Sequence, residues 1–416
     1  MPHRKRVLIT GASIAGNTAA WWLGRYGFDV TVMEKVPEFR DGGQNVDIRG
    51  EAREVLRMMG LEEAVAANGT GERGTAWVDE NNEVIAEFDV DESGGEGFTA
   101  ELEILRGDLS RLIYEDAKKY AAFEFGDMID EVVQSDDGAE VRFKSGRTER
   151  YDIVIVAEGA GSSTRDRVFE GENDPRWMDI TTAYFTIPRG PTDTDVARWY
   201  NAPGGRGVMI RPDPKGTSRA FLTLQVDPGG EQDWEPERQK AFLRERFADA
   251  GWETDRVLDA METAPDFAFD VLRQVKMDRW SDGRVILTGD AAWCATPLSG
   301  IGTTLAIVGS YILAGELARS DDVIAAAMQY ERIMRPFVEE GQGVPKIVPK
   351  LLNPQTKVGL SLLRGVLRVV GLPGVKDIAA KLIVRDSKGI DLPRYAAEVS
   401  TPTDGASSQS AQKAPL

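Results

Sequence analysis

Three small residues near the N-terminus are spaced to bind a pyrophosphate. Gly11, Ser13 and Gly16 follow the apolar run at residues 7–9 in the pattern G-x-S-x-x-G, where the dinucleotide-binding fingerprint has G-x-G-x-x-G. Gly11 permits a tight turn, Ser13 is small enough for a phosphate to approach the backbone, and Gly16 lets a helix pack closely on a strand. The N-terminus of the helix that follows offers free N–H groups and partial positive charge to the phosphates.

An acidic residue stands where such a site holds a ribose. Residues 29–33 read as a second strand, and Glu34 ends that strand. A carboxylate at this place accepts hydrogen bonds from a ribose diol, and we assign the next residue, Lys35, to the same site. The strand before the glycines, the helix after them and the acid together favour dinucleotide binding over an ordinary glycine-rich turn.

Two later apolar strands each end in a glycine beside an acid. Residues 152–157 lead into Glu158–Gly159, and residues 285–287 lead into Gly289–Asp290. Ligands of open parallel sheets bind at the carboxyl ends of the strands, so we expect both acids at the crevice that holds the dinucleotide. The Asp290 carboxylate is suited to accept a hydrogen bond from a ribityl hydroxyl.

The last of these strands is followed by a helix that we expect to touch a ring system. Pro297, Gly300 and Gly302 precede that helix, and glycines at its start let its N-terminus approach a ligand closely. The helix dipole would stabilise negative charge on the edge of the ring system. We therefore assign all three residues to the cofactor site.

Composition excludes several other kinds of function. The net charge of −18 and the isoelectric point of about 4.7 argue against nucleic acids and anionic membrane surfaces as partners. The one histidine is His3 and the one cysteine is Cys294, which excludes an intramolecular disulfide, a His-rich metal site and a Ser–His–Asp triad. We see no signal peptide and no apolar run of membrane-spanning length, and we expect a cytoplasmic protein with no metal.

Sequence texture divides the chain into segments of different character. Buried parallel strands and nucleotide motifs favour one discontinuous Rossmann-like α/β domain, made of residues 1–72, 100–175 and 280–343. Strands broken by Pro–Gly turns favour an inserted antiparallel substrate domain, with a β segment at 73–99 and the main block at 176–279. Helices are predicted over 344–399, and the Ser-, Ala-, Pro- and Gln-rich residues 400–416 read as a disordered tail.

The three motifs, in this order and at these separations, resemble those of the single-component FAD-dependent aromatic hydroxylases, the para-hydroxybenzoate hydroxylase-like fold group. Within that group the sequence is similar to tetracycline-inactivating and antibiotic-tailoring flavin monooxygenases. The resemblance covers about residues 5–340. It implies a Rossmann-like FAD-binding domain with an inserted substrate sheet, and an FAD that is bound without a covalent link.

The resemblance also implies roles for single residues. Glu34 matches the ribose acid of the family, and Asp290 matches its ribityl acid. Arg106, between a short strand and a helix, matches an Arg that contacts the flavin. Asp47 matches a loop Asp near the flavin, and Arg40 lies near a loop Arg that is linked to NADPH.

Four positions depart from the family pattern. Glu158 stands where the family has Asp, and Trp293 stands where it usually has His. Thr304 and Gly309 occupy the places of an Asn and an Asp that usually follow the Gly-x-Gly. These departures bear on contacts to the flavin edge and leave the adenine and pyrophosphate site intact.

The activity implied by the resemblance is that of an FAD-dependent monooxygenase. NADPH or NADH would reduce the flavin, O2 would form a C4a-hydroperoxyflavin, and one oxygen atom would go to an aromatic or polyketide-like small molecule. No catalytic residue is assigned, because no internal His is available as a base. Tyr184, Met209 and Phe221 lie on strands of the middle block, where alternation favours substrate contact for some of them and core packing is an equal alternative.

Two other functions remain open on the sequence. A reductase or dehydrogenase of the same fold would oxidise NAD(P)H without inserting oxygen. A non-catalytic protein would bind flavin or a drug without turnover. We expect a monomer or a homodimer, with a small molecule as the ligand.

Overall fold

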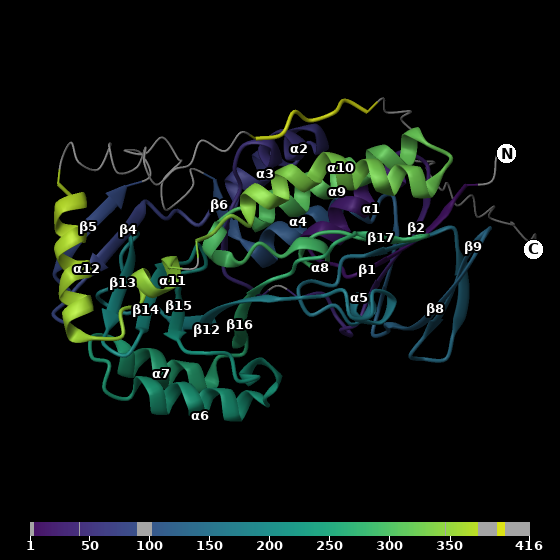
Figure 1. Ribbon diagram of the computed structural model, residues 1–416. Helices are drawn as coiled ribbons and strands as arrows, with labels where there is room; N and C mark the ends of the chain where they lie inside the picture. The colour runs from purple at the N-terminus through teal and green to yellow at the C-terminus, as the bar shows by residue number, and fades with distance from the viewer. Residues whose placement is uncertain (1–3, 41, 90–101, 346, 373–388, 396–416) are drawn as a thin grey trace, which may run out of the picture.

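Two large sheets dominate the structure. The computed structural model describes residues 4–40, 42–89, 102–345, 347–372 and 389–395. One sheet has six strands and the other has seven. In Figure 1 the six-stranded sheet and its helices lie on the right, and the seven-stranded sheet lies on the left.

The six-stranded sheet carries the N-terminal motif at its centre. Its order is β17–β18–β11–β1–β2–β7, and every pair is parallel except β17 with β18. Its strands are β1 (Arg6–Thr10), β2 (Asp29–Glu34), β7 (Ala122–Phe125), β11 (Ile153–Val156), β17 (Ser281–Asp282) and β18 (Val285–Leu287). Val7, Leu8 and Ile9 of β1 are fully buried, as expected for a parallel sheet that is covered on both faces.

Four long helices pack together beside this sheet. They are α1 (Ile14–Arg25), α4 (Arg106–Ala117), α9 (Gly302–Arg319) and α10 (Val323–Gly341). Helix α1 packs against α4 and α9, and α9 packs against α10. The shorter helices are α2 (Glu51–Met59), α3 (Glu62–Ala67), α5 (Ser163–Val168) and α8 (Asp290–Trp293). A three-stranded antiparallel sheet adds β8 (Ile129–Ser135), β9 (Gly138–Phe143) and β10 (Thr148–Tyr151).

The seven-stranded sheet has the order β16–β12–β15–β14–β13–β4–β5. Its strands are β4 (Gly74–Val78), β5 (Val84–Asp89), β12 (Arg176–Pro188), β13 (Ala197–Ala202), β14 (Arg206–Pro212), β15 (Thr217–Gln225) and β16 (Ala268–Gln274). All of its pairs are antiparallel except β4 with β13. This parallel pair joins two segments that are far apart in the sequence. This is the combination of an α/β nucleotide-binding fold and an inserted sheet that the sequence predicted.

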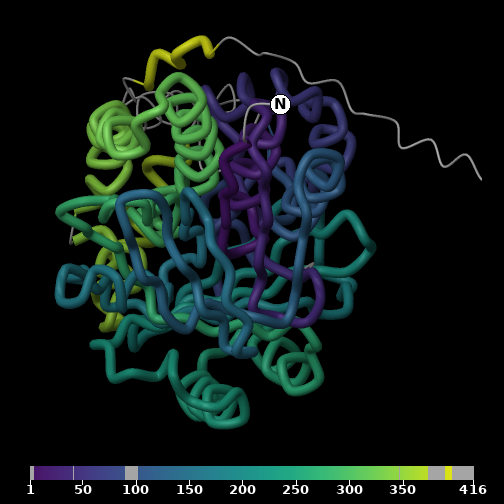
Figure 2. The backbone as a smooth tube through the Cα atoms, turned by 90° about the vertical axis from the view of Figure 1, so that its right-hand side faces the viewer, coloured from purple at the N-terminus to yellow at the C-terminus, as the bar shows by residue number. Residues whose placement is uncertain are grey.

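One face of the seven-stranded sheet forms a second hydrophobic core. Helices α6 (Pro236–Phe247) and α7 (Thr254–Thr263) cover this face, and Figure 2 shows them at the bottom of the molecule, opposite α10. Ala183, Phe185, Leu222 and Val208 point into that core together with Leu243 of α6. Because side chains alternate along a strand, the residues between them face the other way.

The structure differs from the sequence-based expectation at two places. Residues 45–47, which read as a loop, form strand β3 (Asn45–Asp47), and this strand pairs antiparallel with β6 (Glu103–Leu105). The expected C-terminal helical region is split into α11 (Val348–Leu352) and α12 (Lys357–Val370), with Pro354 between them. The tail predicted at 400–416 lies outside the described residues.

The C-terminal part of the chain contacts the seven-stranded sheet and helix α9. Helix α12 packs against β5 of the seven-stranded sheet. Tyr395 returns to the nucleotide-binding part, where its hydroxyl donates a hydrogen bond to Glu316 of α9 at 2.8 Å and its ring packs on Tyr311. Among the described residues, no helix combines the length and the apolar character needed to cross a membrane.

Candidate active site

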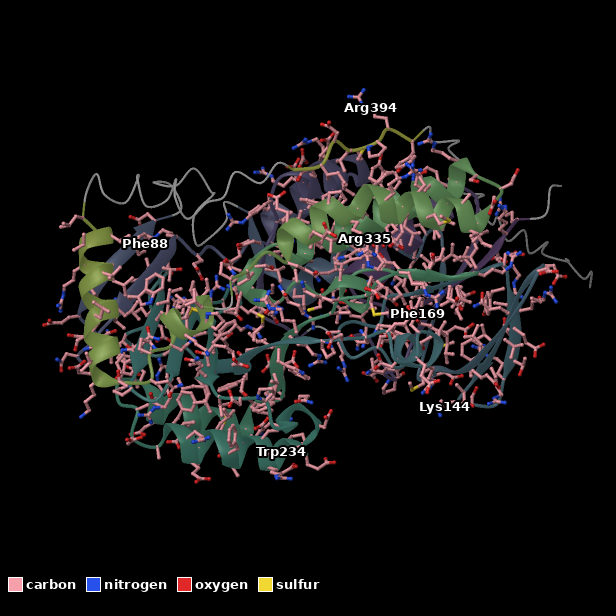
Figure 3. The ribbon with its side chains drawn as sticks, viewed as in Figure 1. Phe88, Lys144, Phe169, Trp234, Arg335 and Arg394 are labelled. Carbon is pink, nitrogen blue, oxygen red and sulfur yellow. The ribbon has the colours of Figure 1, made fainter. Side chains whose placement is uncertain are left out.

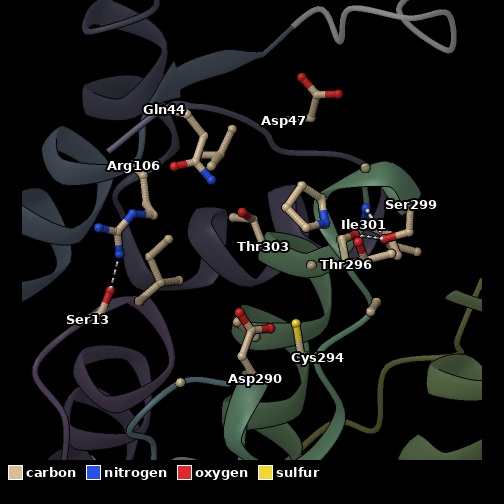
Figure 4. A pocket seen from close by; sticks show the side chains of 18 of the residues that line it. Ser13, Gln44, Asp47, Arg106, Asp290, Cys294, Thr296, Ser299, Ile301 and Thr303 are labelled. Carbon is tan, nitrogen blue, oxygen red and sulfur yellow. Dashed lines mark hydrogen bonds between the residues drawn. The ribbon is translucent and has the colours of Figure 1, made fainter. Parts of the chain in front are cut away.

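A large cavity lies where the two sheets meet. Its volume is about 1550 Å³, and its walls come from both sheets and from the start of α9. A pocket for one small ligand usually measures about 300–1,000 Å³, so this cavity has room for two ligands. Figure 4 shows the part nearest the nucleotide motifs, with Ser13, Arg106 and Asp290 around it.

The turn from β1 to α1 fits only glycine at two places. Gly11 has φ +100°, and a Cβ on it would lie 2.3 Å from the carbonyl oxygen of Ala157. A Cβ on Gly16 would lie 1.9 Å from the carbonyl oxygen of Gly11. The backbone of residues 11–15 therefore lines the cavity directly, with the N-terminus of α1 beside it, as a pyrophosphate site requires.

Two backbone hydrogen bonds hold the Glu34 side chain beside this turn. Its Oε2 accepts a hydrogen bond from the N–H of Ala12 at 2.9 Å, and its Oε1 accepts one from the N–H of Val36 at 3.2 Å. The carboxylate therefore holds the turn and faces the cavity at the same time. Lys35 and Arg40 line the same end of the cavity, and both are exposed.

Arg106 joins two loops that are distant in sequence. Its Nη1 donates a hydrogen bond to Ser13 Oγ at 3.3 Å (Figure 4), and its Nη2 donates one to the carbonyl oxygen of Gly42 at 3.1 Å. Gly43 has φ +138°, and a Cβ on it would lie 2.5 Å from Arg106 Nε. The sequence pointed to Arg106, but it gave no reason to single out Gly42 and Gly43, whose role depends on this long-range contact.

Asp290 is the first residue of α8 and its side chain reaches the cavity. Partial loss of solvation within the protein raises the pKa of this carboxyl to about 6. The charge of Arg106 lowers the pKa, and the charge of Asp270 raises it. Cys294 lies beside it in Figure 4, and burial raises the pKa of the thiol well above its usual value. The thiol is therefore protonated at neutral pH, which argues against its use as a nucleophile.

The start of α9 presents open backbone and buried polar atoms to the cavity. Gly300 and Gly302 line the cavity, and a Cβ on either would meet no heavy atom within 4 Å. The hydroxyls of Thr296 and Thr304 and the Oε1 of Gln44 are buried without a hydrogen-bond partner among the described residues. These atoms, together with Pro297, fit a ring system with a polar edge, which is what a bound flavin would present.

Two further acids have partners within the protein. Asp47 ends β3, lines the cavity and forms an ion pair with Arg49 at 2.7 Å. Glu158 accepts hydrogen bonds from the hydroxyl of Ser162 and from the hydroxyl and N–H of Thr164. The Glu158 side chain thus stabilises the turn into α5.

Tyr184, Met209 and Phe221 all face the cavity. They lie on β12, β14 and β15, where Tyr184 is paired with Phe221 and Phe221 with Met209. Burial raises the pKa of the Tyr184 hydroxyl. Sequence analysis missed Trp77 and Trp199, which line the same cavity; their place beside the other three residues depends on the pairing of β13 with β14 and with β4, which no local pattern encodes.

Comparison with known proteins gives one family and several similar chains. The family model described as FAD binding domain matches residues 4–325. A flavin-dependent monooxygenase from an unknown prokaryotic organism is 38% identical over 345 residues, with 82% of this chain and 89% of that protein covered. Monooxygenase CTB7 of Cercospora beticola is 37% identical, with 94% and 97% covered. The crystal structure of tetracycline destructase Tet(51) matches with a TM-score of 0.80 and 30% identity, covering 94% of this chain and 100% of that one.

Proposed function

This chain belongs to the FAD-binding domain family of FAD-dependent monooxygenases, and from that membership we propose a reaction for its cavity. The enzyme uses NAD(P)H and O2 to insert one oxygen atom into an aromatic or polyketide-like small molecule. Bound FAD supplies the chemistry that side chains lack, namely storage of the electrons from NAD(P)H and activation of O2 as a C4a-hydroperoxyflavin. The protein binds and orients both ligands and excludes water.

One observation carries the proposal: a single cavity has nucleotide-binding residues on one wall and aromatic residues on the other. Gly11, Glu34 and Arg106 surround one end, and Tyr184 and Phe221 line the facing sheet. A planar aromatic substrate on that sheet would lie against the ring system of a flavin that extends from the glycine turn. The cavity volume of about 1550 Å³ suits this pair of ligands better than FAD alone.

Each wall has a separate task in this proposal. Glu34 binds the ribose, the start of α1 binds the pyrophosphate, and Asp290 accepts a hydrogen bond from the ribityl chain. The N-terminus of α9 stabilises negative charge on the reduced ring. The seven-stranded sheet selects the substrate, so residues 73–99 and 176–279 set specificity while the other segments hold FAD.

The nicotinamide cofactor has no separate binding domain in this proposal. The sequence holds one dinucleotide fingerprint, which we assign to FAD, so NAD(P)H binds transiently at the cavity. Arg40 is an exposed cation that lines the cavity, and it is the residue we assign to NAD(P)H. Similarity to a tetracycline destructase makes antibiotics of polyketide origin the first compounds to test.

A screen of NAD(P)H oxidation tests the proposal. Purified protein loaded with FAD is mixed with NADPH or NADH and with phenolic or polyketide compounds in turn. We expect at least one compound to stimulate oxidation and to gain one oxygen atom. A reductase of the same fold would consume NAD(P)H and return a product without added oxygen. A protein that only binds flavin or a drug would leave the rate unchanged for every compound.

A further inference from the structure

A continuous row of large side chains crosses the cavity face of the seven-stranded sheet. The row is Tyr184 on β12, Phe221 on β15, Met209 on β14, Trp199 on β13 and Trp77 on β4. Each is the direct cross-strand partner of the next, and all five line the cavity. Neighbouring strands are about 4.8 Å apart, so the four steps from Tyr184 to Trp77 span about 19 Å.

Polar residues border the row on both sides. Along the same strands, Thr182, Thr223 and Gly207 lie on one side, and they are paired across β12, β15 and β14. On the other side, Arg211 is held by Glu72 and Glu103, and Arg219 is held by Asp213 and Asp266. The row is therefore a narrow apolar strip, which suits the face of a long flat ligand better than a compact one.

The far end of the row is the most aromatic part. Trp77 and Trp199 are stacked with ring centroids 5.1 Å apart and an interplanar angle of 20°, and Phe88 meets Trp77 edge-on at 5.6 Å. The hydrophobic core of this sheet lies on its opposite face, against α6 and α7, and this pair is not part of that core. Figure 3 labels Phe88 at this end, next to α12.

The other end of the row lies next to the cofactor residues. Tyr184 is close enough to Arg106 and Asp290 for both charges to act on its hydroxyl. The reacting atom of a substrate would lie near this end. A ligand with a single ring held there would stop several strands short of the tryptophan pair.

We propose that Trp199, stacked on the buried Trp77, forms a distal stacking subsite that binds the far end of a flat, multi-ring substrate. This inference rests on the proposed function, in which the substrate lies on this sheet against the flavin, with its reacting atom near Tyr184. The row selects substrates by length: additional fused rings extend toward the tryptophans and gain contact there, while a single-ring phenol gains nothing from them.

The test measures binding to the FAD-loaded protein by isothermal titration calorimetry. The probes are phenol, naphthol, a hydroxyanthraquinone and a linear four-ring naphthacenequinone. The main variant is Trp199→Leu, because Trp199 is half-buried while Trp77 is 3% exposed and its loss endangers folding. Trp199→Phe keeps an aromatic ring. Trp234→Leu is the matched control, since Trp234 lies beside α6, far from the cavity (Figure 3).

The native protein should bind the probes more tightly as the number of rings increases. Trp199→Leu should weaken binding of the four-ring probe about 3- to 10-fold and leave phenol within about twofold, while Trp199→Phe retains most of the affinity. An equal loss for all probes, no loss for any, or an equal loss in Trp234→Leu would overturn the subsite. Because binding is measured without turnover, failure to oxygenate these compounds would count against the proposed function and leave this result standing.

Discussion

Gly309 of α9 lies directly against the indole of Trp293. A Cβ on Gly309 would come within 2.7 Å of Trp293 Cζ2. The indole also packs on Trp280 and Tyr330, with ring centroids 4.5 and 5.8 Å away. Trp293 and Gly309 are two of the departures from the family pattern, and they complement each other in volume. The large side chain on α8 fits because Gly309 on α9 has none. Neither residue lines the cavity, whereas Thr304, a third departure from the family pattern, does.

Gly309→Ala should destabilise the protein despite the better helix propensity of Ala. The methyl group has no space beside Trp293, which costs about 1–3 kcal/mol, while propensity returns at most about 1 kcal/mol. Urea unfolding of the FAD-free protein measures the difference. Gly365→Ala on α12 is the control, because a Cβ there meets no heavy atom within 4 Å, and it should be neutral or stabilising. Equal stability of the two variants would show that the contact with Trp293 is not tight.

Glu34→Ala should weaken FAD binding by about 1.5–3 kcal/mol, the size of a hydrogen bond to a charged group. The variant also leaves the N–H groups of Ala12 and Val36 without their acceptor, so the FAD-free protein should lose some stability as well. A fluorescence titration with FAD gives the affinity. Glu38→Ala is the control, since Glu38 is exposed and lies outside the cavity. If Glu34→Ala left the FAD affinity unchanged, Glu34 would stabilise the turn without contacting FAD.

Glu103 makes stability depend on pH. Burial raises its pKa to about 7; Arg211 lowers the pKa, and Glu72 and Asp47 raise it. The folded protein therefore binds a proton more tightly than the unfolded chain does, and its stability falls as the pH rises from about 4.5 to about 7. Glu103→Gln cannot ionise, so its stability should not fall across this window as that of the native protein does.

Urea unfolding at pH 5 and pH 8 checks this prediction. The control for Glu103→Gln is Glu63→Gln, which changes an exposed acid of α3. The control variant should follow the native protein at both pH values. If Glu103→Gln showed the same dependence on pH as the native protein, the buried cluster of Glu72, Glu103 and Arg211 would not hold the extra proton.

Local patterns pointed to one part of the candidate site. The turn at Gly11 and Gly16 depends on neighbours in sequence, Glu34 ends an apolar strand and Asp290 follows another, so spacing was enough to single them out. The strand Asn45–Asp47 was missed because three residues are too few to show an alternation. Its partner, Glu103–Leu105, is more than fifty residues away along the chain.

The other part of the candidate site depends on contacts between distant segments. Trp77 belongs to the aromatic row only because β4 pairs in parallel with β13, and no local signal encodes that pairing. Alternation along the strands did not decide whether Tyr184, Met209 and Phe221 face the hydrophobic core or the cavity. It shows that a strand has two faces but not which of them is covered. The covering helices α6 and α7 decide the matter in the structure.

We propose that the enzyme transfers one oxygen atom from O2 to a small molecule, and isotope labelling tests this directly. FAD-loaded protein, NAD(P)H and a compound that stimulates oxidation are incubated under ¹⁸O2, and the product is examined by mass spectrometry. We predict that each product molecule carries one ¹⁸O atom and that one NAD(P)H is consumed for each. An unlabelled product, or NAD(P)H consumption that yields only hydrogen peroxide and the unchanged compound, would contradict the claim.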